Sequence, residues 1–283
     1  MNTLPVGPPA LGIELAADAS VSDDGWLVRE LSLPNDLDGP PGVLQGGFAA
    51  TIPVEVARAA DPHGAPLTQV ETRLYAPTPL GRTIQARVRA TDLVAHYEVE
   101  TWAGDTLLTR AVVELAGREL TSRAYDLVEL ATVPLPPAES GHPFTACWGC
   151  GSSPKHELGQ RIFPRSVSQT TVSMPWVADE LLAGDDLAAD PLVIGAVLDC
   201  PTMFASMPYL TERGYLAGLL GGFHLRMLRD APVYEPLRIV ARMDQAEGRK
   251  VRARSGLVDE DGVTYATADA FMVAVKRLPT VAA

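Results

Sequence analysis

Two stretches of the chain share one pattern of apolar and polar positions. Each contains a run that is apolar on nearly all sides, at residues 44–60 and 191–207, followed by segments in which apolar and polar residues alternate. A helix that is buried all round has the first composition, and strands with one buried face have the second. The pattern therefore predicts two core helices, each followed by an antiparallel meander of strands.

The predicted strands flank both helices. In the first half they fall at residues 11–16, 26–33, 67–75, 83–91, 95–102 and 107–115, and in the second half at residues 160–164, 170–174, 216–228, 237–244, 251–258 and 264–275. A Pro-rich connector at residues 132–143 lies between the halves. We expect an α+β protein of two domains, residues 1–137 and residues 138–283.

The composition fits a packed protein rather than a disordered one. The chain has 283 residues, of which 47% are hydrophobic, and a formal net charge of −12. So acidic a chain lacks the basic face that nucleic acid requires. No apolar run has the length of a membrane span, and the N-terminus lacks the pattern of a signal peptide. We expect a cytoplasmic protein that binds neither nucleic acid nor a membrane.

The three cysteines, Cys147, Cys150 and Cys200, form an odd set that cannot all pair internally, which fits a reducing compartment. Cys147 and Cys150 have the ligand spacing of a zinc site, and His142 and His156 lie nearby in the sequence. The spacing of these four residues is irregular, so we favour a packed loop and expect neither a metal nor a cofactor. Cys200 has no histidine beside it and is interpreted as a small core residue.

Positive charge is concentrated between Arg226 and Arg254, where basic residues exceed acidic ones by four. Exposed strand faces commonly carry arginine and lysine for solubility and edge protection, and this is the favoured interpretation. The alternative is that Arg252 and Arg254, which project from one strand face, form the mouth of a site for a phosphorylated carrier such as coenzyme A. These two arginines are therefore candidate substrate-binding residues.

Several motifs resemble those of the acyl-coenzyme A thioesterases of hotdog fold. In the first half the resemblance rests on Leu44-Gln45-Gly46-Gly47 and on residues 68–77, and in the second half on residues 147–151, residues 161–164 and Leu198-Asp199-Cys200-Pro201. The second group is similar to thioesterase-like actinobacterial proteins. The resemblance covers most of the chain and implies a double hotdog, with two antiparallel sheets that each wrap around a long central helix.

The resemblance also implies where catalysis takes place. Hotdog domains work in pairs, and each active site takes its Gly-rich turn from one partner and its carboxylate from the other. Crossing the two halves combines Gln45, Gly46 and Gly47 with Asp199, whereas the reciprocal crossing offers no Gly-Gly turn and, at best, Glu55. Family members often have histidine where this chain has Gln45. We therefore expect one composite catalytic site.

Thioester hydrolysis gives these residue types a physical role. Backbone N–H groups at a helix N-terminus stabilise the negative charge that develops on the carbonyl oxygen, and glycine lets that oxygen approach closely. Gln45 can donate a further hydrogen bond or orient water. Asp199 lies among apolar residues, so we expect a raised pKa and a role as general base or as nucleophile. The alternatives are a plain tight turn for the glycines and a role for Asp199 in capping or kinking a helix.

Two registers can relate the two helices, and both stay open. The glycine-to-proline spacing that the helices share places Thr51 opposite Asp199. Counting from the paired glycines, as in the family, places Val54 or Glu55 there instead.

The favoured function is hydrolysis of acyl-coenzyme A or other acyl thioesters at a single site. Thr68, at the start of the strand after the first helix, is a further candidate for substrate binding, although an ordinary strand threonine is the simpler interpretation. The main alternative is a non-catalytic double-hotdog protein that binds acyl thioesters or lipids. A hotdog hydratase ranks last, because it needs an Asp/His pair on a loop that the sequence does not offer. Association of the double-hotdog unit into a homo-oligomer is compatible with the sequence.

Overall fold

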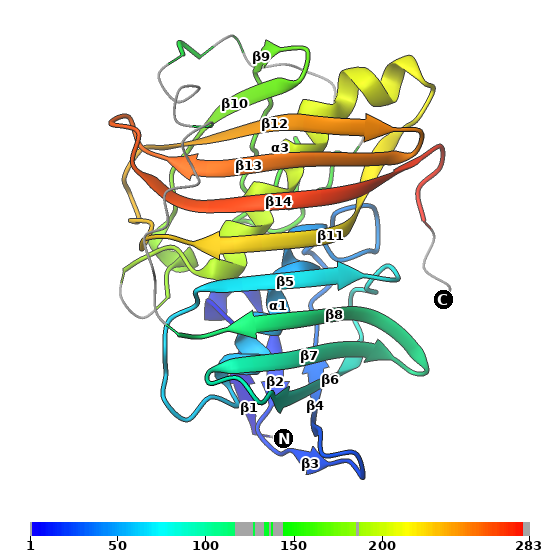
Figure 1. The fold of residues 1–283 in the computed structure, drawn as a ribbon, viewed down its shortest axis with the longest axis vertical. Helices are drawn as coiled ribbons and strands as arrows, with labels where there is room; N and C mark the ends of the chain where they lie inside the picture. The colour runs from blue at the N-terminus through cyan, green and yellow to red at the C-terminus, as the bar shows by residue number, and fades with distance from the viewer. Residues whose placement is uncertain are drawn as a thin grey trace.

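One continuous antiparallel sheet forms the framework of the protein (Figure 1). The computed structural model describes residues 2–116, 127, 133–135, 137, 144–184 and 187–279. Within these residues the sheet has 14 strands in the order β1-β2-β4-β6-β7-β8-β5-β11-β14-β13-β12-β10-β9, and β3 pairs with β4 beside this path. The strands of the first half of the chain lie together, and so do those of the second half.

Each half contributes one part of the sheet. The strands of the first half are β1 (Thr3–Pro5), β2 (Glu14–Ala16), β3 (Ser20–Val21), β4 (Leu27–Ser32), β5 (Gln69–Leu74), β6 (Thr83–Ala90), β7 (His96–Ala103) and β8 (Thr106–Glu114). Those of the second half are β9 (Ser166–Ser168), β10 (Thr171–Trp176), β11 (Ala217–Met227), β12 (Leu237–Glu247), β13 (Lys250–Val258) and β14 (Thr264–Val275). Two short 3-10 helices, η1 (Pro9–Leu11) and η2 (Glu180–Leu182), accompany them.

The predicted strand at residues 160–164 is wrong, because this segment has no regular structure. Its backbone pairs with a loop instead: the Gln160 N–H donates to the Trp148 carbonyl at 2.8 Å, and the Ile162 N–H donates to the Gly149 carbonyl at 3.0 Å. At the start of the chain, the predicted strand at residues 11–16 is shortened to β2, because η1 occupies the residues up to Leu11. The remaining predicted strands have observed counterparts.

The two parts of the sheet join at β5 and β11, so the prediction of two separate sheets is not confirmed. β5 pairs with β8 on one side and with β11 on the other, with Thr72 opposite Phe223 across the junction. Either strand alone would present unpaired N–H and C=O groups at an edge, and the junction satisfies them. The predicted domain boundary stays a prediction, because residue 138 lies outside the described residues.

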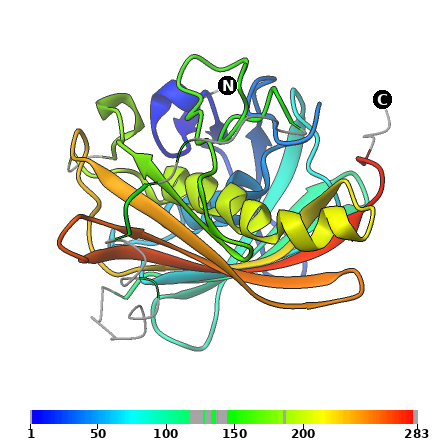
Figure 2. The same cartoon turned by 90° about the horizontal axis from the view of Figure 1, so that it is seen from above.

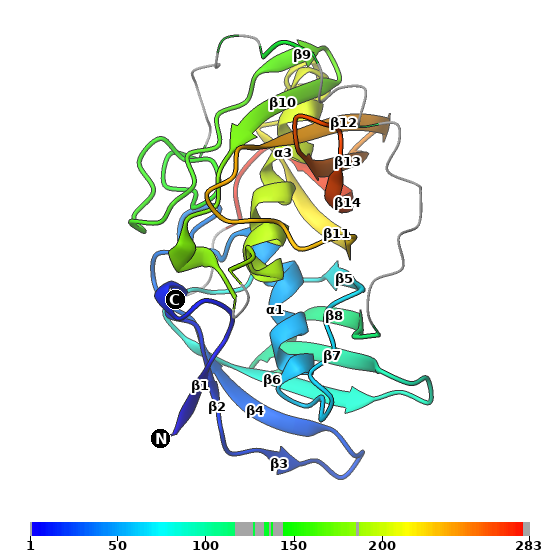
Figure 3. The same cartoon turned by 90° about the vertical axis from the view of Figure 1, so that its left-hand side faces the viewer.

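Two α-helices, α1 (Gly46–Arg58) and α3 (Pro191–Glu212), lie on the concave face of the sheet (Figures 2 and 3). Most residues of both helices are buried, as the apolar composition predicts. By length and composition α3 would be able to cross a membrane, but 78% of its apolar window is buried inside the protein. It is therefore a core helix around which the sheet curves.

The two helices run antiparallel and approach closely because glycines lie at their contact. A Cβ atom on Gly47 would overlap the carbonyl oxygen of Gly195, and a Cβ atom on Gly195 would overlap the side chain of Thr51. Close packing leaves no room for either atom. The Thr51 hydroxyl adds a hydrogen bond of 3.3 Å to the Leu192 carbonyl. This crossing places the N-terminus of α1 beside the middle of α3.

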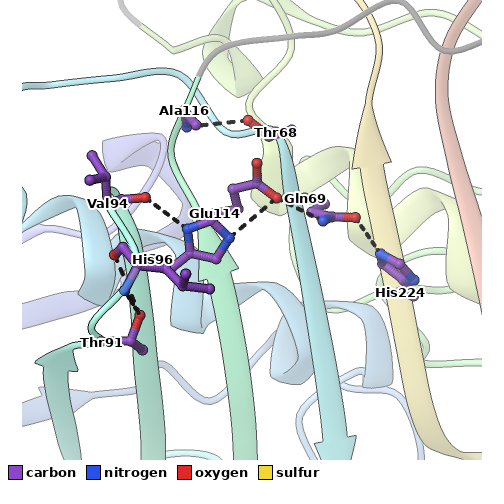
Figure 4. A network of polar contacts seen from close by, with 9 residues as sticks. Thr68, Gln69, Thr91, Val94, His96, Glu114, Ala116 and His224 are labelled. Atoms are coloured by element: carbon purple, nitrogen blue, oxygen red, sulfur yellow. Dashed lines mark hydrogen bonds and ion pairs between the residues drawn. The ribbon is translucent and has the colours of Figure 1, made fainter.

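The convex face of the sheet carries a polar network that crosses the junction (Figure 4). Gln69 on β5 donates a hydrogen bond of 2.7 Å to Glu114 on β8, and its Oε1 accepts one of 2.8 Å from His224 on β11. His96 on β7 lies 3.7 Å from the Glu114 carboxylate. Side chains of both halves therefore contact one another on this face as well.

Candidate active site

Gln45 caps the N-terminus of α1. Its Oε1 accepts a hydrogen bond of 3.0 Å from the Phe48 N–H, and its own backbone N–H donates to the Leu37 carbonyl at 2.9 Å. The first turn of a helix leaves N–H groups without an intrahelical acceptor, and a capping side chain supplies one. Because Oε1 is held in this way, Nε2 is directed at α3, where it donates to the Ala196 carbonyl at 3.0 Å.

Asp199 on α3 faces this N-terminus because the helices are antiparallel. Its Oδ2 accepts hydrogen bonds from the Gly47 N–H and from Gln45 Nε2, both at 2.9 Å. Three of the residues that the crossing of the halves combines are thus in direct contact. Asp199 does not cap its own helix, because Asp190 caps α3 and accepts a hydrogen bond of 2.7 Å from the Leu192 N–H. The alternative that Asp199 kinks α3 at Pro201 stays a prediction.

Burial raises the pKa of Asp199 to about 7. The charge of Cys147 adds to the rise, and the hydrogen bond from the Gly47 N–H opposes it. A carboxyl group titrates near neutrality when its charged form loses contact with water and has no counter-ion to replace it. Such a group is suited to take a proton from water and to release it later.

A cavity of about 290 Å³ lies beside this cluster and is bordered by Gln45, Gly46 and Asp199. Asp199 as a residue is half-buried, and it belongs to the wall of this cavity. The remaining walls are largely apolar and include Val43, Leu44, Ala49, Met203, Leu219 and Leu220. Small-molecule sites commonly combine apolar walls with a few converging polar groups, and this cavity has that character.

Gly46 supplies the available N–H group of the helix N-terminus. It borders the cavity, and its N–H has no hydrogen-bond partner among the described residues, whereas the Gly47 N–H is bonded to Asp199. A Cβ atom on Gly46 would lie 2.8 Å from Asp199 Oδ2. Glycine is therefore needed here for the close approach of the carboxyl group, and the helix dipole favours negative charge at the same point.

The three cysteines also border the cavity, a placement that the sequence did not reveal. Cys147 Sγ lies 3.1 Å from Cys150 Sγ and 3.7 Å from Cys200 Sγ. Burial raises the pKa of the Cys150 thiol well above its usual value, and the contact with Cys147 does the same for Cys200. Of the two histidines near this pair in the sequence, His156 does not join the cysteine cluster, and its ring accepts a hydrogen bond from the Leu158 N–H at 3.1 Å. His142 lies outside the described residues.

Glu55 lies at the other end of the helix pair, apart from the cavity. Its Oε1 is 2.6 Å from Arg58 Nη1, which is also 3.6 Å from Asp190 Oδ2. Burial raises the pKa of Glu55 to about 7, and the negative charge of Asp190 adds to this rise. Its neighbours are thus an arginine and a second carboxyl group rather than a glycine turn.

The predicted substrate-binding residues Thr68, Arg252 and Arg254 do not border the cavity either. Thr68 Oγ1 accepts a hydrogen bond of 3.2 Å from the Ala116 N–H (Figure 4). On β13, Arg254 Nε donates to an Asp244 carboxylate oxygen at 2.7 Å, and the Arg252 guanidinium lies 5.5 Å from the centre of the Phe271 ring. Neighbouring β13 side chains point inward, so both arginines lie on the convex face of the sheet.

The helix caps favour one of the two registers. Asp199 is the ninth residue after its cap Asp190, and Val54 is the ninth residue after its cap Gln45. This agrees with counting from the paired glycines, which places Val54 or Glu55 at the position of Asp199. The alternative that pairs Thr51 with Asp199 does not match the caps.

No protein-family model matches the sequence, and no curated protein matches it significantly. Solved structures do match. The acyl-CoA thioesterase II TesB2 from Mycobacterium marinum has a TM-score of 0.59 and 13% identity, over 93% of this chain and 96% of the other. A hot dog fold protein of unknown function from Alicyclobacillus acidocaldarius has a TM-score of 0.59 and 15% identity, over 94% and 97%.

A third similar structure is the dehydratase domain of the polyketide PpsC from Mycobacterium tuberculosis, with a TM-score of 0.62 and 15% identity, over 92% of this chain and 97% of the other. At these identities the likeness establishes the fold. The chain has the hotdog fold, and the resemblance to the hotdog thioesterases is confirmed at that level.

Proposed function

We propose that the chain hydrolyses acyl thioesters, with Asp199 as general base and the Gly46 N–H as donor to the carbonyl oxygen. The observation that carries the proposal is the contact of Asp199 Oδ2 with Gln45 Nε2 and the Gly47 N–H, both at 2.9 Å, beside an apolar cavity. The solved structure named as an acyl-CoA thioesterase II supports this class of substrate. We propose acyl-coenzyme A as the substrate for the same reason.

The two hydrogen bonds to Oδ2 leave the other carboxylate oxygen of Asp199, Oδ1, without a partner among the described residues. A water molecule in the cavity gives a proton to Oδ1 as its oxygen attacks the thioester carbon. The electrons of the C=O π bond move to the carbonyl oxygen, which accepts a hydrogen bond from the Gly46 N–H. When the C=O bond re-forms, the C–S bond breaks, and the leaving thiolate takes the proton from Asp199.

Gln45 is a positioning residue in this mechanism. Its amide is fixed at one end by the Phe48 N–H and at the other by the Ala196 carbonyl, so its hydrogen bond holds Asp199 in one orientation. The acyl group lies in the cavity, whose largely apolar walls suit a hydrocarbon chain.

Release of free thiol from a panel of short, long and aromatic acyl-coenzyme A substrates tests the proposal. The wild-type chain is expected to turn over at least one class, and Asp199→Asn is expected to lose this activity. Asp105→Asn makes the same chemical change in an exposed hairpin turn and is the matched control. Unchanged turnover in Asp199→Asn, with a folded variant by circular dichroism, would remove Asp199 from the mechanism.

A second candidate function is binding of acyl thioesters without hydrolysis. It is favoured by one observation: the Gly47 N–H, a donor at the helix N-terminus, is already bonded to Asp199 and is not available to a substrate. Isothermal titration with the same panel distinguishes the two functions, since binding without thiol release selects this one. The dehydratase neighbour does not favour a third function, because no histidine is among the described residues that border the cavity.

A further inference from the structure

The three cysteines meet at one point although they come from two separate elements. Cys147 and Cys150 lie on the loop that leads into the second half, and Cys200 lies on α3. Their Sγ atoms all lie within 4.8 Å of one another, with separations of 3.1 Å and 3.7 Å for the two pairs that involve Cys147. Ligands at about 2.3 Å from a tetrahedral zinc ion are about 3.8 Å apart. The Cys147–Cys200 separation matches this spacing, and Cys147 and Cys150 lie about 0.7 Å closer together, so binding of such an ion requires these two sulfur atoms to move apart.

The loop is built to present two sulfur atoms on the same side. The Gly151 N–H donates to the Cys147 carbonyl at 2.8 Å, which closes a tight turn around the pair. A Cβ atom on Gly151 would lie 2.6 Å from the same carbonyl oxygen, and one on Gly149 would lie 3.0 Å from Cys200 Sγ. Gly151 is thus needed for the turn to form, and Gly149 lets the loop approach the third cysteine closely.

Contacts with the first half hold this loop in place. The Trp148 N–H donates to the Asp38 carbonyl at 2.7 Å, and the Trp148 ring packs edge-on against Phe48 at 4.6 Å between ring centres. Gln45 Nε2 lies 3.5 Å from Cys200 Sγ. The two N–H groups of this amide donate to Ala196 and Asp199, so the contact with Cys200 places the first half against the cysteine cluster without a further hydrogen bond.

We propose that Cys147, Cys150 and Cys200 bind one thiophilic divalent cation, Zn²⁺, as three thiolates that release their protons on binding. A cluster of three cysteine sulfur atoms is typical of a zinc site. Within the described part of the chain, no histidine, aspartate or glutamate joins this group. All three cysteines border the cavity. The cavity therefore offers space for a fourth ligand such as water. The proposal does not rest on the proposed hydrolysis.

Metal content and cobalt substitution test this site in the full chain. After purification with a reducing agent from zinc-supplemented cells, about one equivalent of zinc per chain is expected by mass spectrometry of the element. After removal of zinc with a chelator, added Co²⁺ is expected to give sulfur-to-cobalt charge-transfer absorption together with the intense visible bands of tetrahedral coordination. Less than about a tenth of an equivalent of metal after reconstitution, or a cobalt spectrum without charge transfer, overturns the proposal.

Variants identify the ligands. Cys150→Ser and Cys200→Ser are each expected to lose most of the bound zinc, and His156→Ala is expected to retain it. Loss of zinc in His156→Ala would overturn this ligand set, and a Cys147–Cys150 disulfide that persists in the protein purified with a reducing agent would overturn the site. Should the serine variants fail to fold, the cobalt spectrum of the wild-type chain still decides. Metal binding and thiol release are measured separately, so failure of one proposal is distinguishable from failure of the other.

Discussion

The two ends of the α1–α3 helix pair occupy equivalent positions and differ in chemistry. At one end the cap is an amide, Gln45, and it faces the carboxyl group of Asp199. At the other end the cap is a carboxyl group, Asp190, and it lies near Glu55. An amide donates a hydrogen bond to a carboxylate, whereas two carboxylates repel each other and need a cation between them. Arg58 supplies that cation at the second end only.

The two ends also differ in access. The cavity borders Asp199, whereas the N-terminal segment lies over the second end. Gly7 donates a backbone hydrogen bond to Glu55, and a Cβ atom on Gly7 would lie 2.8 Å from Leu192 Cδ2. Among the described residues, the open end therefore has a carboxyl group without a counter-ion, and the closed end holds an ion cluster.

The largest expected effect is the loss of activity in Asp199→Asn, compared with Asp190→Asn at the other end. Asparagine still accepts hydrogen bonds from Gln45 and Gly47 but cannot take a proton from water, so kcat is expected to fall by about 10²–10⁴-fold. Asparagine is also a good helix cap, so Asp190→Asn is expected to stay within about twofold of wild type. Steady-state thiol release measures both variants. Equal losses of kcat in the two variants would show that the two ends of the helix pair do not differ in their role in catalysis.

A second prediction converts the open end into a copy of the closed one. Gln45→Glu places a carboxylate against Asp199 without an arginine, so we expect kcat to fall by about 10²-fold through repulsion and a displaced general base. Gln45→Met removes the same hydrogen bonds without adding charge, and a smaller loss of about tenfold is expected. If both variants lose activity equally, the loss reflects the missing hydrogen bonds and not the added charge.

A third prediction concerns the crossing that separates the two ends. Gly195→Ala places a methyl group against Thr51, whose side chain is fully buried, so we expect a loss of about 2–3 kcal/mol in the free energy of unfolding. Because the overlapping atoms all belong to the Thr51 side chain, adding Thr51→Ala is expected to restore part of the loss. Urea denaturation measures both. If Gly195→Ala alone is as stable as wild type, the helices can move apart with little loss in the free energy of unfolding.

Much of the fold was predictable from the sequence because buried positions recur with the period of the helix or strand that contains them. Both helices lie within or around the predicted apolar runs, and β14 spans Thr264–Val275, as the alternation predicts. The junction of β5 with β11 was not predictable, since alternation indicates which face of a strand is buried but not which strand pairs with it. Residues 160–164 were misassigned for a related reason, because their hydrogen bonds go to a loop that no pattern specifies.

The candidate site was predictable only in part. The contact between Asp199 and Gln45 was expected from the resemblance, because no spacing in the chain relates residues so far apart. The sequence predicts a core position for Cys200, and the residue is buried, but its contact with Cys147 depends on how the loop meets α3. Asp190 offered a usable signal, since an aspartate immediately before a proline is typical of a helix start.

The smallest expected effect is a change in how stability depends on pH, and it tests the closed end directly. Burial raises the pKa of Glu55 from its ordinary value of 4.5 to about 7, so the folded chain holds this proton more tightly than the unfolded chain. Below the ordinary value Glu55 is protonated in both the folded and the unfolded chain, so it does not lower the free energy of unfolding. As the pH rises through the interval, the unfolded chain releases its proton first, and the free energy of unfolding falls.

Glutamine cannot ionise, so Glu55→Gln is expected to lack this fall. The variant gains about 2 kcal/mol relative to wild type between about pH 5 and about pH 8, less than the full pKa difference implies because part of the interval lies below pH 5. Urea denaturation at both pH values measures the gain, and Asp105→Asn is expected to follow wild type. Parallel curves for Glu55→Gln and wild type would show that the Glu55 pKa is not raised by folding. Arg58 would then compensate both carboxyl groups fully, and access alone would distinguish the closed end from the open one.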